Sequence, residues 1–97
     1  MTVSPTTITL SSRVLIPEDV LFQELNGEAV ILDLASERYF GLDEVGTRFW
    51  QLLNDDPSVQ AAYDVLCREY DVEASRLGTD LLLLAGNLLD AGLIRTE

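Results

Sequence analysis

The stretch AVILDLASERYFGLDEVGTRFWQLL, residues 29–53, decides the fold of this chain. It opens with Ala29-Val30-Ile31-Leu32, an unbroken apolar run that is typical of a strand covered on at least one face. Arg38-Tyr39-Phe40-Gly41 is a second, aromatic segment with strand composition. The apolar residues then change to helical spacing: Val45, Phe49, Trp50 and Leu53. This one stretch therefore predicts two strands followed by an amphipathic helix.

Upstream of this stretch, a further strand is predicted. Residues 20–25, Val-Leu-Phe-Gln-Glu-Leu, have strand composition and are followed by Asn26-Gly27. Asn-Gly between two apolar runs is the best short signal for a hairpin, because both turn positions tolerate a positive φ. Residues 1–12 are rich in serine and threonine and carry no strong period. We expect a flexible arm there and a single domain over residues 13–97.

Three helices are predicted downstream. Asp43 is suited to cap the first, over residues 44–54, because its carboxylate can accept from the free amides of the first turn. Ser58 is suited to cap a second helix, and a third is expected over residues 73–91. The third helix has a core stripe at helical spacing: Leu77, Leu81, Leu84 and Leu88. Three strands followed by three helices predict a compact α+β domain, winged-helix-like in outline, with a three-stranded antiparallel sheet.

The composition argues against several classes of function. The chain has 97 residues and a net charge of −11, with six basic residues, all arginine. A nucleic-acid binder must neutralise phosphates with cations, so no nucleic-acid partner is expected. With no histidine and one cysteine, Cys67, the chain offers no zinc ligand set, and we expect no metal and no cofactor. No catalytic constellation stands out, so an enzyme is not expected.

The sequence also indicates the cellular compartment of the chain. A single cysteine excludes an internal disulfide and fits a reducing compartment, so we expect a cytoplasmic protein. The apolar stretch over residues 81–89 is about half of the ~20 residues that a membrane-spanning helix needs. No membrane partner is expected.

Two features favour a surface that binds a peptide. Residues 38–41 are expected at the end of the small sheet, where a free backbone edge can accept a peptide strand by main-chain pairing. The last helix also carries more leucines than one stripe needs, because three fall outside it: Leu82, Leu83 and Leu89. Those leucines fit a helix that is buried on two sides, a peptide groove or a dimer face.

The side chains near this edge have two interpretations each. Tyr39 and Phe40 alternate across their strand, so one is expected to face the core and the other solvent or a partner. Arg38 and Arg48 would meet a carboxylate of a ligand or form ion pairs within the domain. The acidic neighbours for such pairs are Glu37, Asp43 and Glu44.

In the order and spacing of its motifs, the chain resembles the PqqD-like family over roughly residues 13–95. The first block of motifs runs from the aromatic strand into the first helix: Tyr39-Phe40-Gly41-Leu42-Asp43-Glu44-Val45-Gly46 and Phe49-Trp50-Gln51-Leu52-Leu53. The second block lies in the C-terminal half: Glu69-Tyr70-Asp71, Asp80-Leu81, Leu84-Ala85, Leu88 and Gly92-Leu93-Ile94. The chain departs from the family at Asp43, where many relatives have asparagine, and both residues are good N-caps.

The resemblance implies a non-enzymatic adaptor that binds the leader of a ribosomally made precursor peptide. Such an adaptor presents the peptide to a leader peptidase or another modifying enzyme, and the chain looks most like the lasso-peptide branch. In the family the leader adds as a strand beside the third strand of the sheet, against the third helix. Carried onto this chain, the expected leader-binding residues are Arg38, Tyr39, Phe40, Leu42, Asp80, Leu83, Leu84 and Asn87.

Two other functions remain as alternatives. The surplus leucines of the last helix fit a structural dimer or an interaction subunit without a peptide ligand, so the chain is expected as a monomer or a dimer. A winged-helix regulator that binds DNA would share the fold. The net charge of −11 and the lack of a basic recognition helix argue against that regulator.

Overall fold

A three-stranded antiparallel sheet forms one layer of the molecule. The computed structural model describes residues 8–97, and the sheet consists of β2 (Val20–Leu25), β3 (Glu28–Asp33) and β4 (Arg38–Leu42) in that order. The β2–β3 hairpin turns at Asn26-Gly27, whose φ angles of 58° and 84° are the positive values that this turn requires. The Asn-Gly hairpin prediction is thereby confirmed.

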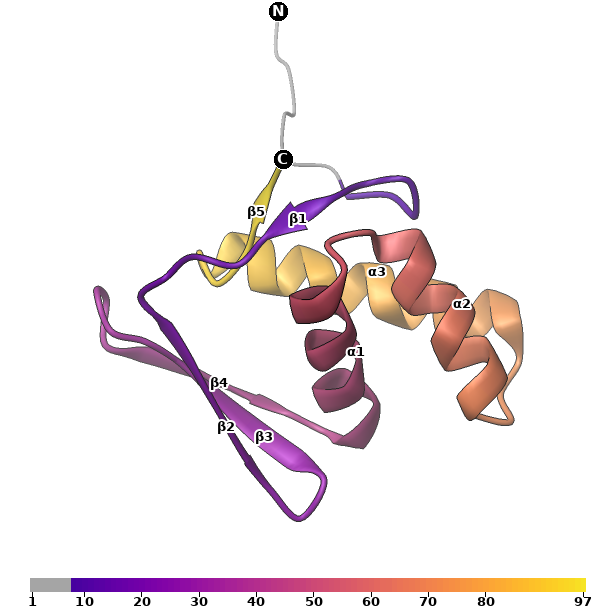
Figure 1. Cartoon of the computed structure of the whole chain (residues 1–97), viewed down its shortest axis with the longest axis horizontal. Helices are drawn as coiled ribbons and strands as arrows, with labels where there is room; N and C mark the ends of the chain where they lie inside the picture. Colours follow the sequence, from indigo (N-terminus) through magenta and orange to yellow (C-terminus); the bar gives the residue numbers. More distant parts are fainter. Residues whose placement is uncertain (1–7) are drawn as a thin grey trace, which may run out of the picture.

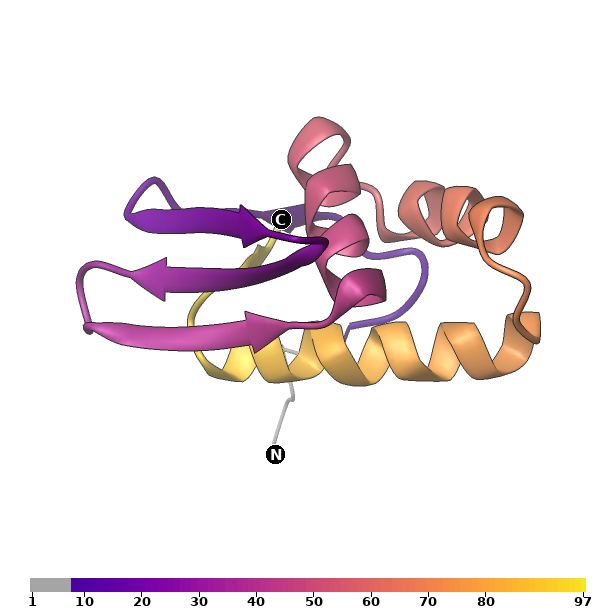
Figure 2. The ribbon, with the colours of Figure 1, turned by 90° about the horizontal axis from the view of Figure 1, so that it is seen from below.

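The helices lie on one side of the sheet (Figures 1 and 2). They are α1 (Glu44–Asp55), α2 (Val59–Glu69) and α3 (Ala74–Asp90). Helix α1 is packed directly on the sheet, with α2 on the far side of α1 (Figure 1). Both predicted N-caps are present: Asp43 Oδ1 accepts from the Gly46 amide at 2.8 Å, and Ser58 Oγ accepts from the Ala61 amide at 3.1 Å. The predicted α+β fold, with three antiparallel strands followed by three helices, is confirmed.

A second, two-stranded ribbon joins the two ends of the domain, and the sequence did not predict it. β1 (Val14–Leu15) pairs with β5 (Arg95–Thr96) in antiparallel register. Residues 1–7 of the expected arm lie outside the described residues. Residues 8–12 form a turn in which the Ser12 amide donates to the Thr9 carbonyl at 3.0 Å. The division of the chain at residue 12 stays a prediction.

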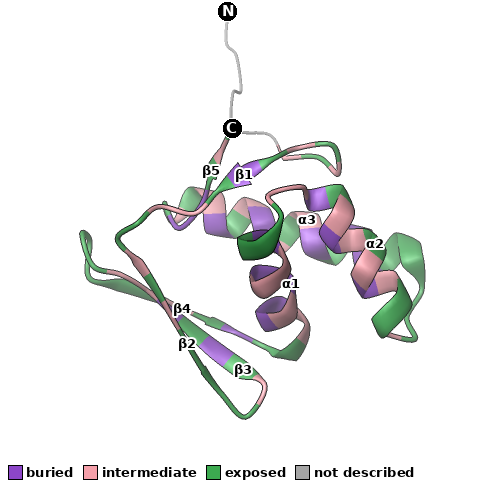
Figure 3. Cartoon of the chain, in the orientation of Figure 1, coloured by how far each residue is buried: buried purple, intermediate pink, exposed green. Residues whose placement is uncertain are grey.

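The hydrophobic core extends from the inner face of the sheet into the space among the three helices (Figure 3). Ile31 of the central strand and Phe49 of α1 are fully buried at its centre. Phe22 of β2 stacks on Trp50 of α1 with ring centroids 6.4 Å apart, which ties the far strand to the same helix. α1 is therefore the element through which the sheet packs on the rest of the domain.

The core stripe of α3 differs from the predicted one at a single position. Leu77, Leu81 and Leu88 are buried as expected, but Ala85 occupies the fourth core position and Leu84 is only half-buried. Ala85 is fully buried, and a second small residue of α3, Gly78, packs closely on α2, where a Cβ would lie 3.3 Å from the Tyr63 ring. Small residues thus face the neighbouring elements, and Leu84 points to one side of the core.

The surplus leucines of α3 are mostly accounted for by packing. Leu82 and Leu89 are partly buried against the core, so the helix is covered on more than one side. Leu83 remains 65% exposed. A single exposed leucine is ordinary on a protein surface, so α3 gives little support to a dimer face.

A paired side-chain contact holds α1 against α2. Arg48 donates from Nε to Glu69 Oε1 at 2.9 Å and from Nη2 to Glu69 Oε2 at 2.8 Å. This contact raises the pKa of Arg48 and lowers the pKa of Glu69. Arg48 is therefore used within the domain, although its partner is not one of the acidic neighbours that the sequence suggested.

We expect Asp43→Ala to lower the free energy of unfolding by about 1 kcal/mol, because the first turn of α1 loses its side-chain cap. Asp43→Asn should keep most of that stability, since asparagine caps equally well. Urea unfolding followed by circular dichroism measures both. An equal loss in the two variants would mean that the cap is not the source of the effect.

The Arg48–Glu69 contact should make stability depend on pH. The folded-state pKa of Glu69 is depressed, so its contribution is present above the unfolded pKa and is lost as pH falls through the folded value. In Arg48→Met, an NMR titration should show the pKa of Glu69 returning toward its ordinary value. If the pKa of Glu69 stays depressed in this variant, Arg48 is not the cause of the depression.

Candidate functional site

The main sheet has two edge strands, β2 and β4, and the unpaired edge of β4 is the one beside α3 (Figure 2). β4 pairs with β3 on one side, and no described strand pairs with its other side. In Figure 2 this open side of β4 lies next to α3. An unpaired strand edge presents a row of free N–H and C=O groups that another chain can pair with.

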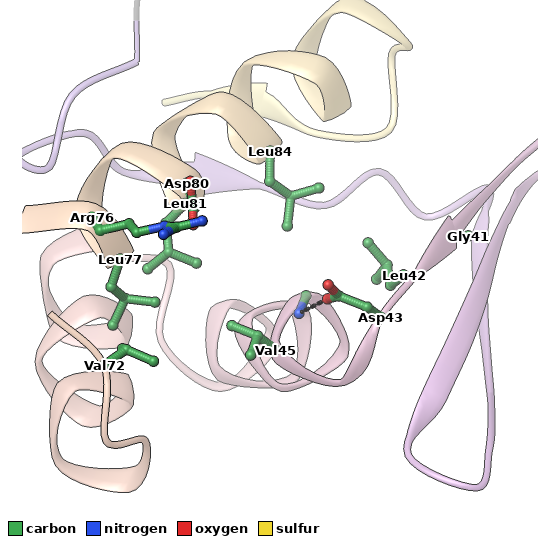
Figure 4. Close-up of a pocket in the computed structure, with 11 residues that line it drawn as sticks. Gly41, Leu42, Asp43, Val45, Val72, Arg76, Leu77, Asp80, Leu81 and Leu84 are labelled. Atoms are coloured by element: carbon green, nitrogen blue, oxygen red, sulfur yellow. Dashed lines mark hydrogen bonds and ion pairs between the residues drawn. The ribbon is translucent and has the colours of Figure 1, made fainter. Parts of the chain in front are cut away.

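A pocket of about 460 Å³ opens where the end of β4 meets the start of α1 and the middle of α3. Figure 4 shows Leu42 and Leu84 pointing toward each other across the first turn of α1, with Leu77 and Leu81 nearer the N-terminal end of α3. The lining is mostly apolar, and it comprises Gly41, Leu42, Asp43, Val45, Gly46, Val72, Arg76, Leu77, Asp80, Leu81 and Leu84. An apolar recess of this size suits one or two buried side chains of a ligand.

Gly46 forms the narrow part of this pocket. A Cβ at this position would lie 3.2 Å from Asp43 Oδ1 and 3.3 Å from a methyl group of Leu42 and of Leu84. These distances are tighter than ordinary van der Waals contact. The glycine inside the predicted helix is therefore explained by the close approach of the Leu84 and Leu42 side chains.

The charged groups lie at the rim of the pocket. Arg76 and Asp80 are 3.9 Å apart, one helical turn from each other on α3, and both side chains are largely exposed. Such a surface pair contributes little to stability and can separate readily. The third charged group, Asp43, already accepts from the first turn of α1. The pocket thus combines an apolar interior with two charges of opposite sign that are free to meet a ligand.

The structure brings three of the eight predicted leader-binding residues into this pocket: Leu42, Asp80 and Leu84. Arg38, Tyr39 and Phe40 lie along β4 outside it, with Phe40 half-buried and Tyr39 exposed on the opposite face. Leu83 and Asn87 are exposed on α3, within one turn of Leu84. The eight residues therefore lie along β4 and one side of α3, and their role in binding stays a prediction.

Sequence reasoning missed more than half of the pocket lining. The missed residues are Gly41, Asp43, Val45, Gly46, Val72, Arg76, Leu77 and Leu81. Arg76 and Leu77 precede Asp80 by one helical turn, so helical spacing was a usable signal for them. Val72 lies in the loop before α3, and no sequence pattern connects it with the first turn of α1.

Within residues 8–97 there is no group of three or more histidine, cysteine, aspartate or glutamate residues that could hold a metal ion. None of the helices in that range is long and apolar enough to cross a membrane. Cys67 is half-buried on α2 and packs against the core, which fits the use of cysteine as a small hydrophobic residue.

The fold recurs in known proteins. The chain is 33% identical to TbiB1, solved in complex with the TbiA(beta) leader peptide, with a TM-score of 0.76 over 81% of this chain and 92% of that one. A lasso peptide synthetase B1 complexed with its leader peptide shares the fold, with a TM-score of 0.74 at 23% identity over 84% and 96% of the two chains.

A curated relative and a family model match as well. A PqqA binding protein of Rhodopseudomonas palustris (strain BisB5) is 30% identical over 90 residues, which span 91% of this chain and 86% of the relative. Residues 28–94 match the family described as coenzyme PQQ synthesis protein D (PqqD). This match spans the sheet from β3 onward and all three helices, so the chain belongs to the PqqD family.

Proposed function

We propose that this chain is an adaptor that binds the leader of a ribosomally made precursor peptide and presents the peptide to a modifying enzyme. The observation that carries the proposal is the open edge of β4 beside an apolar pocket on α3. Support comes from two relatives: a protein named for binding PqqA, and TbiB1, which was solved in complex with a leader peptide.

In the proposed complex the leader lies as an added strand beside β4. Main-chain pairing with residues 38–42 would fix the register of the peptide, since every second residue of β4 offers its N–H and C=O outward. Apolar side chains of the leader would enter the pocket between Leu42 and Leu84. Pairing gives affinity without sequence selection, and the pocket adds the selection.

Charged groups at both ends of the groove would orient the peptide. Arg38 forms no ion pair with any described residue, so its guanidinium is available to a carboxylate of the leader. Asp80 would meet a basic residue of the leader at the other end, once its long contact with Arg76 opens. The remaining proposed contacts are Tyr39, Phe40, Leu83 and Asn87.

The adaptor would act by proximity. Holding the leader beside an enzyme turns a bimolecular encounter into an intramolecular one, at effective concentrations on the order of millimolar for a short flexible linker. The proposed partner is a leader peptidase or another modifying enzyme, with lasso-peptide biosynthesis as the favoured setting because TbiB1 is similar over most of the chain. The proposed location is the cytoplasm, where a single unpaired cysteine is stable.

Leader binding should perturb the backbone amides of β4 first. In an NMR titration with the leader of the precursor encoded beside this gene, we expect the largest shifts at residues 38–42 and along the Leu84 side of α3. Shifts confined to α2 or to the β1–β5 ribbon would contradict strand addition at β4.

Leu84→Ala should weaken leader binding about 10- to 100-fold, the equivalent of roughly 1.5–3 kcal/mol for an apolar side chain buried by the peptide. Fluorescence anisotropy with a labelled leader measures the change. Leu15→Ala is the matched control, because Leu15 is a half-exposed leucine on β1, away from the groove. Equal affinity of the Leu84→Ala variant and the unchanged protein would place the peptide elsewhere.

Gly46→Ala should narrow the pocket and lower leader affinity while the fold remains intact. Alanine favours a helix over glycine by up to about 1 kcal/mol, and the crowding by Leu42 and Leu84 offsets part of that gain. Gly86→Ala is the control on α3, since a Cβ there meets nothing within 4 Å. It should raise stability and leave affinity unchanged. Equal leader affinities of the Gly46→Ala and Gly86→Ala variants would show that the pocket does not contribute to leader binding.

A further inference from the structure

The face of the main sheet that points away from the helices is uncovered. In Figure 2 no helix lies in front of the three strands, and in Figure 1 all three helices lie on the other side. Strand alternation assigns Phe22, Ile31 and Phe40, which are neighbours in register, to the helix side. Their neighbours Leu21, Leu32 and Tyr39 form the matching row on the uncovered side.

This uncovered side is unusually apolar. Four of the eight exposed large hydrophobic side chains of the described residues occupy outward strand positions, and a fifth, Leu34, directly follows β3; their exposures lie between 47% and 77%. The five side chains are Leu21, Leu25, Val30, Leu34 and Tyr39. We call these five residues, together with Leu32, the outer face. Contiguous exposed apolar surface on a small domain marks an interaction site.

The charges around the outer face have one sign. Glu28 is an outward residue of β3, and Asp19 directly precedes β2 at the opposite end of the sheet; both are exposed. None of the outward positions of β2, β3 and β4 carries an arginine. A second copy of this chain would bring carboxylates against carboxylates, on a molecule with a net charge of −11. The face is instead complementary to an apolar surface with basic residues at its rim.

The outer face is also continuous with the proposed leader site. Tyr39 belongs to β4, so a leader strand added at the open edge would extend the row formed by Leu21, Leu32 and Tyr39. Every second side chain of that added strand would project onto the same side. A protein seated on the outer face would therefore touch both the adaptor and the peptide that it carries.

We propose that the outer face is the docking surface for the modifying enzyme, through an apolar enzyme surface with basic residues at its rim. This inference rests on the proposed leader-binding function. It assigns the two partners to two sides of β4, the peptide to its open edge and the enzyme to the face that the helices leave free.

The test uses the full-length chain and the modifying enzyme encoded beside its gene. Leu21→Thr with Val30→Thr removes apolar surface from β2 and β3, away from the β4 edge, and threonine keeps strand propensity. Leu15→Thr is the matched control, since Leu15 is 49% exposed and Leu21 is 51% exposed. We expect the double variant to bind immobilised enzyme on the order of tenfold more weakly and the control to bind normally. Asp19→Asn with Glu28→Gln should slow association and reduce its dependence on salt.

Leader affinity, measured by anisotropy on the same variants, separates the two proposals. Weakened enzyme binding with unchanged leader affinity supports the inference. Unchanged enzyme binding in the double variant overturns the inference and leaves leader binding intact. Failure of the unchanged protein to bind leader overturns the proposed function and this inference with it. Sedimentation of the free protein tests whether a second copy binds the outer face. If the unchanged protein is a dimer and the double variant is a monomer, the face belongs to a second copy and the inference is overturned.

Discussion

The junction between β4 and α1 sets the geometry of the whole domain. The chain leaves the sheet at Leu42, whose side chain is buried, and turns at once into a helix capped by Asp43. The buried Thr47 hydroxyl donates to the Leu42 carbonyl at 3.5 Å, and its amide donates to the Asp43 carbonyl at 2.8 Å. These bonds fix the angle between the last strand and the helix on which the sheet packs. The position of α3 beside the β4 edge follows from that angle, because α3 reaches α1 at Gly46.

Much of this arrangement could be predicted because local chemistry determines it. Asn26-Gly27 predicted the hairpin, and Asp43 and Ser58 predicted two helix starts, since each of these residues acts on its immediate neighbours. The β1–β5 ribbon was not predictable in the same way. Two residues are too short to show a period, and their partners lie at the other end of the chain.

The site was predictable only in part, for two physical reasons. A run of four leucines, residues 81–84, has no helical phase of its own, so the sequence placed Leu84 in the core where Ala85 lies. Which of these positions is buried depends on where the neighbouring elements cover α3, and they cover Ala85. The pocket itself is formed by segments that are far apart in the sequence. Val72 and Gly46 both line it, and no local sequence pattern predicts that they lie close together. Leu42, Asp80 and Leu84 were named through the family resemblance.

The β1–β5 ribbon brings the beginning and the end of the folded domain side by side (Figure 1). Beyond the two paired residues of each strand, the Glu97 amide donates to the Arg13 carbonyl at 2.9 Å, and the Arg13 and Glu97 side chains form an ion pair at 2.9 Å. The chain thus enters and leaves the domain at one place, on a ribbon separate from the β4 edge. A unit with adjoining ends can be inserted into a loop of another protein or circularly permuted with little disturbance of its interior. The architecture is suited to reuse as a portable module within larger assemblies.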